Sequence, residues 1–280
     1  MKKYEFTGET KQINIINRTV TLHRIKASVA FGNIKSGDIG GWIEKKENLS
    51  HDGDAWVYGD AKVCDNAQIF NNAKIFDDAL VFNNARIFDN TQIFGDAWVY
   101  GNARICDDAQ IFDDARVCDD AQVFDDAKIF GDAWIFGDAK VFNNTQIFDD
   151  ARVYGDAQVF DDAKIFGDAW IFGDAWIFGD ARIFGDARIS ADTKICGDAW
   201  VYSSKHVLSV GPIGSRNDYT TFFRNRNRGI SVSCGCFLGE IDKFIEKVIK
   251  THGENKHASV YRAAAELAKL QIDLSKIEEA

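Results

Sequence analysis

The chain has 280 residues and a formal net charge of −10 at pH 7. Most of this negative charge lies in the central repeat of the chain, which is therefore an unlikely ligand of nucleic acid, because nucleic-acid-binding surfaces neutralise phosphates with Lys and Arg. Hydrophobic residues make up 46% of the sequence, which is too many for a disordered chain. No apolar run approaches the roughly 18 residues of a membrane-spanning helix.

The first 52 residues are predicted to form an N-terminal β cap. Strands are expected near residues 12–16 and 19–26, and the turn-rich residues 35–38 follow them. The repeat that comes next would expose unpaired strand edges and an apolar cross-section at its end. A capping segment prevents such an end from growing by strand pairing with another molecule.

Residues 53–202 are one six-residue pattern written twenty-five times without an insertion. The third position of each hexad is Ala in 22 hexads and Thr in three, and the fifth is always Ile or Val. These positions are two residues apart, so on a strand they face the same side, which must be the core. The fourth position is mostly Lys, Arg, Gln or Trp and must face outward. The first two positions are Gly, Asp or Asn with one exception, and these residues favour turns.

A strand and a corner every six residues predict a parallel β-helix with a triangular cross-section and three hexads per coil. Twenty-five hexads would form about eight coils, stacked about 4.8 Å apart. The predicted fold is therefore mainly β: a single-stranded parallel β-helix over residues 53–202, an N-terminal β cap over 1–52 and a small α+β domain over 203–280.

The C-terminal segment is predicted to have a ββαα arrangement. After a linker through residues 211–212, strands are expected near 219–224 and 230–236. Apolar residues at helical spacing predict one helix that ends at Gly253 and a second from about 257 to 272. The strand region carries a candidate basic cluster for contact with phosphate or nucleic acid, although a solvated turn is the simpler interpretation. This cluster consists of Arg216, Arg224, Arg226 and Arg228.

The repeated [IV]-x-x-x-[AT]-x pattern resembles the hexapeptide repeat of left-handed parallel β-helix proteins, which include acyltransferases, γ-class carbonic anhydrases and uncharacterised bacterial and phage proteins. Residues 31–57, FGNIKSGDIGGWIEKKENLSHDGDAWV, look like the lead-in of a bacterial hexapeptide-repeat group of transferase-like or polymer-forming type. The tail, with IGSRNDYTTFF, SVSCGCF and THGENKHA, resembles the terminal module of related prophage and gut-bacterial proteins. The resemblance implies left-handed winding and a bacterial or phage origin.

Catalysis of the kind found in that family requires histidine: one as the base of the acyltransferases, three on zinc in the carbonic anhydrases. None of the five histidines of this chain lies in the repeat, and no inserted loop is present to hold acetyl-coenzyme A. We therefore expect no catalytic residue, no cofactor and no metal site, and a non-enzymatic scaffold or self-associating module. An acyltransferase-like enzyme is the least favoured alternative. The histidines are His23, His51, His206, His252 and His257.

The sixth position of the hexad is Phe sixteen times and Tyr four times, where the resembled transferases have small residues. Rings one coil apart would stack into ladders that either cover one another or offer a contact surface to another molecule. One such ladder is a candidate interaction surface, with Phe130, Phe148, Phe166 and Phe184.

The fourth position alternates between Trp and Arg from coil to coil on one face. Guanidinium and indole groups at the coil spacing are within cation–π reach, so a structural stack is the simpler interpretation. A contact surface for a protein partner or a second copy is the functional one. This candidate interaction surface consists of Trp98, Arg116, Trp134, Arg152, Trp170 and Arg188.

The repeat holds 28 Asp, no Glu and twelve Lys or Arg, for a net charge of −16. Rows of carboxylates could imitate a nucleic-acid backbone and bind a host DNA-handling or defence protein, which is the alternative function. They could also hold Ca²⁺, although turn formation and solubility explain them more simply. We expect a protein partner or self-association, and neither nucleic acid on the repeat, nor a membrane, nor a small-molecule substrate.

The six cysteines do not suggest a disulfide framework. Four of them replace aromatic residues at the sixth position, and with no recognisable signal peptide a reducing cytoplasm is expected. The C-x-C pair with two following histidines leaves a zinc site open, although buried thiols are the simpler interpretation. These four residues are Cys234, Cys236, His252 and His257.

Overall fold

The computed structural model describes residues 2–275. The chain divides into two compact units, residues 1–149 (unit 1) and 150–280 (unit 2). This division falls inside the repeat, so the predicted domain boundaries near residues 52 and 202 stay predictions. Residue 1 of the predicted cap and residues 276–280 of the predicted C-terminal domain lie outside the described residues.

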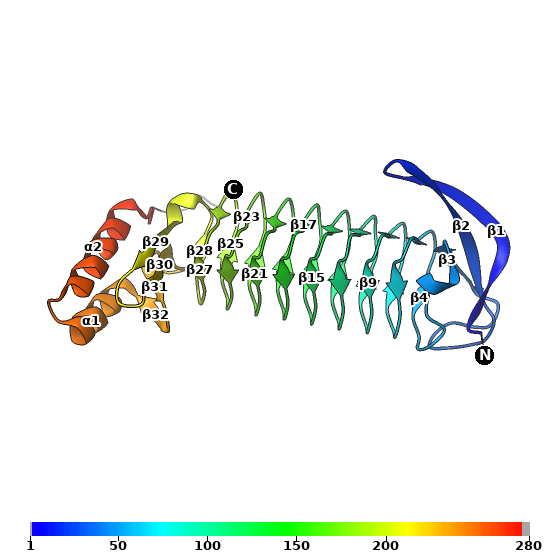
Figure 1. The fold of residues 1–280 in the computed structure, drawn as a ribbon, viewed down its shortest axis with the longest axis horizontal. Coiled ribbons are helices and arrows are strands. Elements are labelled where there is room, and N and C mark those ends of the chain that lie inside the picture. The colour runs from blue at the N-terminus through cyan, green and yellow to red at the C-terminus, as the bar shows by residue number, and fades with distance from the viewer. Residues whose placement is uncertain (1, 276–280) are drawn as a thin grey trace. The chain divides into compact units, whose positions relative to one another are not determined.

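Unit 1 begins with an antiparallel hairpin of β1 (Tyr4–Ile15) and β2 (Arg18–Ala27), followed by β3 (Ile39–Ile43) and a short 3-10 helix, η1 (Lys46–Asn48) (Figure 1). Strand β3 pairs antiparallel with β2 on one side and parallel with β5 (Lys62–Val63), the second strand of the repeat, on the other. The cap thereby supplies part of a coil itself. This is why the solenoid has about nine turns rather than the eight expected from the hexads alone.

The hexads of unit 1 stack in three parallel faces. The first face contains β4 (Trp56–Val57), β7 (Lys74–Ile75), β10 (Gln92–Ile93), β13 (Gln110–Ile111), β16 (Lys128–Ile129) and β19 (Gln146–Ile147). The second contains β5 (Lys62–Val63), β8 (Leu80–Val81), β11 (Trp98–Val99), β14 (Arg116–Val117) and β17 (Trp134–Ile135). The third contains β6 (Gln68–Ile69), β9 (Arg86–Ile87), β12 (Arg104–Ile105), β15 (Gln122–Val123) and β18 (Lys140–Val141).

Unit 2 begins with the same arrangement. Its parallel faces are β20 (Arg152–Val153), β23 (Trp170–Ile171) and β26 (Arg188–Ile189); β21 (Gln158–Val159), β24 (Trp176–Ile177) and β27 (Lys194–Ile195); and β22 (Lys164–Ile165), β25 (Arg182–Ile183) and β28 (Trp200–Val201). Every partner lies 18 residues away, so three hexads make one coil, as predicted.

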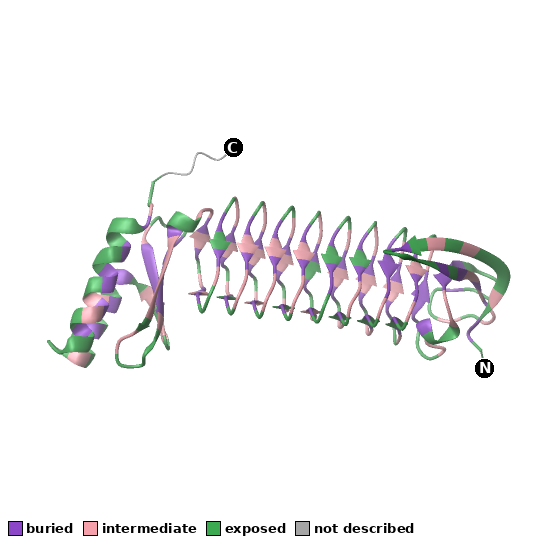
Figure 2. Ribbon diagram, turned by 45° about the horizontal axis from the view of Figure 1, so that its top comes forward, coloured by how far each residue is buried: buried purple, intermediate pink, exposed green. Residues whose placement is uncertain are grey.

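The core of the repeat is formed by the third and fifth positions, as the pattern predicts. Every Ala, Ile and Val at these positions is buried, and Figure 2 shows buried segments on each coil with exposed residues at its corners. Three buried Thr replace Ala, and two of them, Thr91 and Thr145, each donate a hydroxyl hydrogen bond of 2.8 Å to the carbonyl three residues earlier. A buried hydroxyl is therefore accommodated without loss of a hydrogen bond.

The C-terminal part of unit 2 differs from the predicted ββαα arrangement by two additional strands. A 3-10 helix, η2 (Ser204–His206), leads into an antiparallel sheet of β29 (Val207–Ile213), β30 (Asp218–Arg224), β31 (Ile230–Cys234) and β32 (Phe237–Glu240). Helices α1 (Ile241–His252) and α2 (Lys256–Gln271) pack against this sheet, and their buried residues share one core with Phe222 and Val232. None of the described helices is long and apolar enough to cross a membrane.

Candidate interaction surface

The first position of each hexad has a structural role. Its Asp residues adopt left-handed backbone angles, with φ of 56–61°, where an L-residue is tolerated best if it is Asn or Asp. Their carboxylates accept hydrogen bonds from the backbone N–H of the next coil, as from Gly95 to Asp77 (3.1 Å) and from Gly131 to Asp113 (3.2 Å). These carboxylates therefore join coil to coil and are less available to a partner.

The second position gives one corner of the coil a continuous row of exposed carboxylates, which we call the acidic edge. It directly precedes the face that carries Trp and Arg. In unit 1 the acidic edge consists of Asp60, Asp78, Asp96, Asp114 and Asp132, and in unit 2 of Asp150, Asp168 and Asp186. Lys62 forms an ion pair of 3.0 Å with Asp78, and Trp42 Nε1 donates a 3.0 Å hydrogen bond that lowers the pKa of Asp60. Sequence reasoning did not separate this row from the structural first position.

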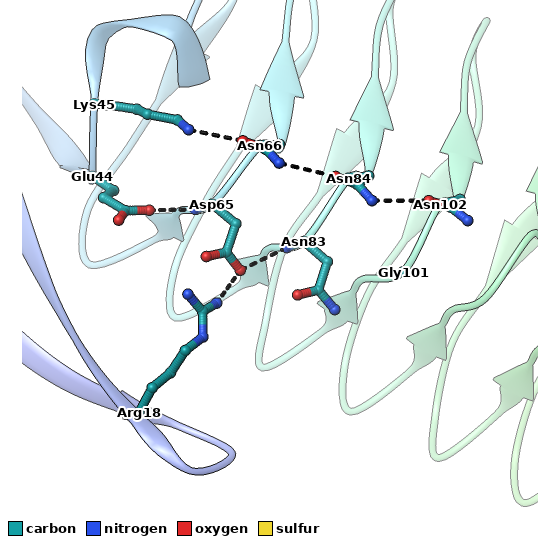
Figure 3. Close-up of a pocket in the computed structure, with 9 residues that line it drawn as sticks. All are labelled: Arg18, Glu44, Lys45, Asp65, Asn66, Asn83, Asn84, Gly101 and Asn102. Atoms are coloured by element: carbon teal, nitrogen blue, oxygen red, sulfur yellow. Dashed lines mark hydrogen bonds and ion pairs between the residues drawn. The ribbon is translucent and has the colours of Figure 1, made fainter.

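Another corner of unit 1 carries amides instead of carboxylates. Figure 3 shows a chain of hydrogen bonds from Lys45 to Asn66 (2.9 Å), from Asn66 to Asn84 (3.2 Å) and from Asn84 to Asn102 (3.0 Å). These side chains line an open hollow of about 530 Å³, where Arg18 also pairs with Asp65. The polar groups in this hollow bind one another, so the corner is best explained as a contact between the cap and the coils.

The Phe ladders are self-covering. Phe130 and Phe148 stack with ring centroids 4.8 Å apart and planes 5° apart, and Phe166 and Phe184 stack at 5.0 Å and 4°. Every Phe of the repeat, all of which the structure describes, is buried or half-buried. This favours the structural interpretation of the sixth position over a contact surface.

The Trp and Arg side chains stack as predicted within each unit. In unit 1 the Arg116 guanidinium lies 5.6 Å from the Trp98 ring, and Trp134 Nε1 donates to Cys118 Sγ at 3.4 Å. In unit 2 the Trp170 ring has Arg152 at 4.9 Å and Arg188 at 5.0 Å. The stacking is incomplete in one place, because 41% of Trp98 stays exposed. We call Trp98, Arg116 and Trp134 the Trp/Arg face of unit 1.

The four arginines of the predicted basic cluster do not form one exposed group. Arg224 is buried and donates from Nη1 to the Trp200 carbonyl at 3.3 Å, and burial lowers its pKa. Arg226 lies 5.8 Å from the Trp200 ring in the following turn, with exposed Arg228 nearby in sequence. Arg216 precedes the seven-residue strand that Arg224 ends, a separation of roughly 20 Å.

The structure also places the cysteines and histidines that the sequence indicated as free thiols or as a zinc site. All six cysteines are free thiols, and three of the four in the repeat are buried. Cys236 is exposed at a turn, Cys234 contacts the Thr220 hydroxyl at 3.3 Å, and the rings of His252 and His257 lie 5.9 Å apart. Within residues 2–275, no group of three or more His, Cys, Asp and Glu side chains is arranged to hold a metal ion.

Comparison with known proteins supports the fold and gives no activity. A family model described as "YdcK Beta solenoid repeat" matches residues 146–161. No curated protein matches the chain. Over the matched stretch the chain is similar to that family, and together with the parallel coils this supports a β-solenoid protein.

Proposed function

We propose that this chain is a non-enzymatic scaffold that associates with a second copy of itself through the Trp/Arg face of unit 1. The observation that carries the proposal is the exposure of Trp98, a large apolar ring in a ladder whose other rings are better covered. Trp and Arg are the residues most enriched among those that dominate protein–protein binding energy. The resemblance in the repeat and tail favours a bacterial or phage origin, and six free thiols suit a reducing cytoplasm.

Light scattering coupled to size-exclusion chromatography tests self-association on the full chain across the micromolar range. We expect the apparent mass to rise above that of the monomer with concentration, and the W98S variant to abolish the rise. The matched control is W176S, because Trp176 has a similar exposure (38%) and lies on β24 of another face. A monomer at every concentration, or equal effects of the two variants, rejects the proposal.

The acidic edge supports a second candidate, an acidic decoy for a DNA-binding protein. A row of carboxylates one coil apart presents regularly spaced negative charge, as a nucleic-acid backbone does. The test is competition between this chain and duplex DNA for a non-specific DNA-binding protein. The variant D78N/D96N/D114N/D132N should lose competition, while a control that removes four charges from the other corners of unit 1, D108N/D120N/D126N/D138N, should keep it. Equal losses in both variants would indicate only an effect of net charge.

An acyltransferase-like activity is the third and weakest candidate, because no histidine lies in the repeat. It predicts binding of acetyl-coenzyme A. Titration calorimetry on the full chain is expected to show no heat of binding, and a saturable signal would reopen an enzymatic function.

A further inference from the structure

A cavity of about 300 Å³ lies in the C-terminal part of unit 2, where the β31–β32 hairpin meets α1 and α2. Its lining combines three basic side chains, Arg216, Lys247 and His252, with the aromatic rings of Phe237, Phe244 and Tyr261. None of its lining residues, all of which the structure describes, is Asp or Glu. Its volume is at the lower end of small-molecule sites, which are typically apolar with a few placed polar groups.

Two positively charged side chains of the cavity lining approach the turn of the β31–β32 hairpin. Arg216 Nη2 lies 3.8 Å from Cys236 Sγ, and Lys247 Nζ lies 5.7 Å from the centre of the Phe237 ring. Cys236 and Phe237 are consecutive, so both cations approach the same turn. Among residues 2–275 neither cation forms an ion pair, whereas neighbouring helical residues such as Lys269 do. Two unneutralised cations beside an apolar cavity favour an anionic ligand.

Two glycines shape the cavity wall. A Cβ on Gly235, whose φ is +59°, would lie 2.5 Å from Arg216 Nη1, so the missing side chain lets the guanidinium rest against the turn. A Cβ on Gly214 would collide with the Tyr261 hydroxyl. The absence of these two Cβ atoms therefore leaves room for one cation and one aromatic residue of the same cavity.

The apolar wall consists of two buried rings and a half-buried one. Phe244 and Tyr261 are 3% and 4% exposed and meet edge to face with centroids 5.6 Å apart, and Phe237 lies 5.4 Å from Phe244. Aromatic rings in such arrangements accept another ring by offset or edge contacts. His252, by contrast, lies at the C-terminal end of α1, where the helix dipole disfavours an anion.

We propose that this pocket binds a small aromatic anion, with its ring against Phe244 and Tyr261 and its carboxylate or phosphate between Arg216 and Lys247. The inference concerns a site of the C-terminal strands and helices and does not depend on self-association through the Trp/Arg face. Charge attracts the anionic group, and the apolar wall selects against ions that lack a ring. Neither part alone defines the ligand class.

Titration calorimetry of the full chain with four probes tests the proposal. Phenyl phosphate and 3-phenylpropionate should bind with a Kd of about 0.1–1 mM, a range reasonable for ligands of about ten non-hydrogen atoms. Neutral 3-phenylpropan-1-ol and inorganic phosphate should each bind at least about tenfold more weakly, since each lacks one of the two recognised features. If only one phenyl anion binds, it identifies carboxylate or phosphate as the ligand group. Failure of both, or equal binding of the neutral alcohol, overturns the proposal.

Variants then assign the site. R216Q and K247Q should each weaken binding of the phenyl anion about fivefold or more. The control is K243Q, which should leave binding unchanged, because Lys243 is exposed on α1, the helix of Lys247, and does not line the cavity. Saturating ligand should also slow alkylation of Cys236, which lines the cavity. Circular dichroism confirms that each variant is folded. Unchanged affinity in R216Q and K247Q, or no protection of Cys236, contradicts the assignment.

Discussion

The side-chain amine of Lys3 donates a 2.9 Å hydrogen bond to the carbonyl oxygen of Ala55, and a second of 3.2 Å to that of Gly53. Within the repeat, a third-position carbonyl accepts from the fourth-position N–H of the preceding coil, as Ala73 does from Trp56. Ala55 belongs to the first hexad, so no earlier hexad supplies such an N–H to its carbonyl. Lys3 therefore satisfies a carbonyl that would otherwise be left at the end of the coils.

The K3M variant tests this capping role through pH. Burial lowers the pKa of Lys3 to about 8, against 10.5 normally, although Asp54 and Asp52 oppose the shift. Between pH 8 and 10.5 the unfolded chain binds more protons at Lys3 than the folded chain, so the Lys3 contribution to the free energy of unfolding rises with pH. The rise is at most about 3 kcal/mol, since one pKa unit corresponds to about 1.4 kcal/mol.

Urea denaturation of wild type and K3M at pH 7.5, 8.5 and 9.5 measures this contribution. The wild type should gain stability relative to K3M as pH rises, and K3M should be the less stable protein because two carbonyls lose a donor. Tyrosine and cysteine also titrate in this range, but both proteins carry the same residues, so their contribution cancels in the difference. A difference between the two proteins that stays constant with pH contradicts the assigned pKa.

Trp170 should contribute measurably to stability, because it lies between Arg152 and Arg188. We expect W170A to lower the free energy of unfolding by about 2 kcal/mol, mostly through lost burial. A double-mutant cycle with R152Q should give a coupling of about 0.5–1 kcal/mol, the usual range for a partly exposed cation–π pair. A second double-mutant cycle, on Trp176 and Lys194, provides the comparison, because Lys194 Nζ lies 5.4 Å from the centre of the Trp176 ring. A coupling indistinguishable from zero at Trp170 would mean that the stack is only geometric.

Sequence reasoning predicted the repeat well because burial there follows directly from position in the hexad. Ala at the third position and Ile or Val at the fifth point to the same side of the strand, which must be the core, so the fourth position faces outward. Three such hexads per coil give the 18-residue spacing, which places Trp and Arg of successive coils side by side. The winding sense remains an implication of the resemblance. The hexad leaves about four residues for each strand once the two turn positions are subtracted, whereas the observed strands contain only the fourth and fifth positions.

The non-repeating ends were harder because tertiary contacts decide their structure. Gly211-Pro212 indicates a linker in sequence, yet β29 continues through it with a shift in register. Arg224 lies in an arginine-rich stretch that is typical of a solvated turn. Its side chain is nevertheless buried and donates to the Trp200 carbonyl. Neither outcome has a local signal, because each depends on what packs nearby. The same holds for Lys3, whose partners lie 50 and 52 residues away.

Thiol reactivity should separate Cys236 from the cysteines of the repeat. Cys236 is exposed, whereas burial raises the pKa of Cys64 to about 12 and that of Cys196 to about 11. The thiolate is the reactive form, so iodoacetamide at pH 8 should modify Cys236 first and leave Cys64 and Cys196 unmodified until urea is added. Peptide mass spectrometry against reaction time gives the order. Early modification of Cys64 in the native protein would show that the core opens locally.

The one Ala at a first position predicts a stabilising substitution. Ala191 has φ of 57°, a left-handed conformation that Gly adopts without steric cost, and the equivalent positions in neighbouring hexads, such as Gly185 and Gly197, are Gly. A191G should therefore raise the free energy of unfolding, by up to about 1 kcal/mol after the extra entropy of Gly in the unfolded chain is subtracted.

The reverse change at Gly101 provides the matched test. In G101A the new alanine has to adopt the left-handed conformation of Gly101, with φ of 71°. Its Cβ would lie 2.6 Å from the backbone nitrogen of Asp119 in the next coil. Because that neighbour is backbone and cannot rotate away, we expect a loss of about 2 kcal/mol or more. Thermal and urea unfolding of the two variants measure the opposite signs. If both substitutions destabilise, the corner at Ala191 must depend on its methyl group for packing, and backbone conformation alone does not determine the first position.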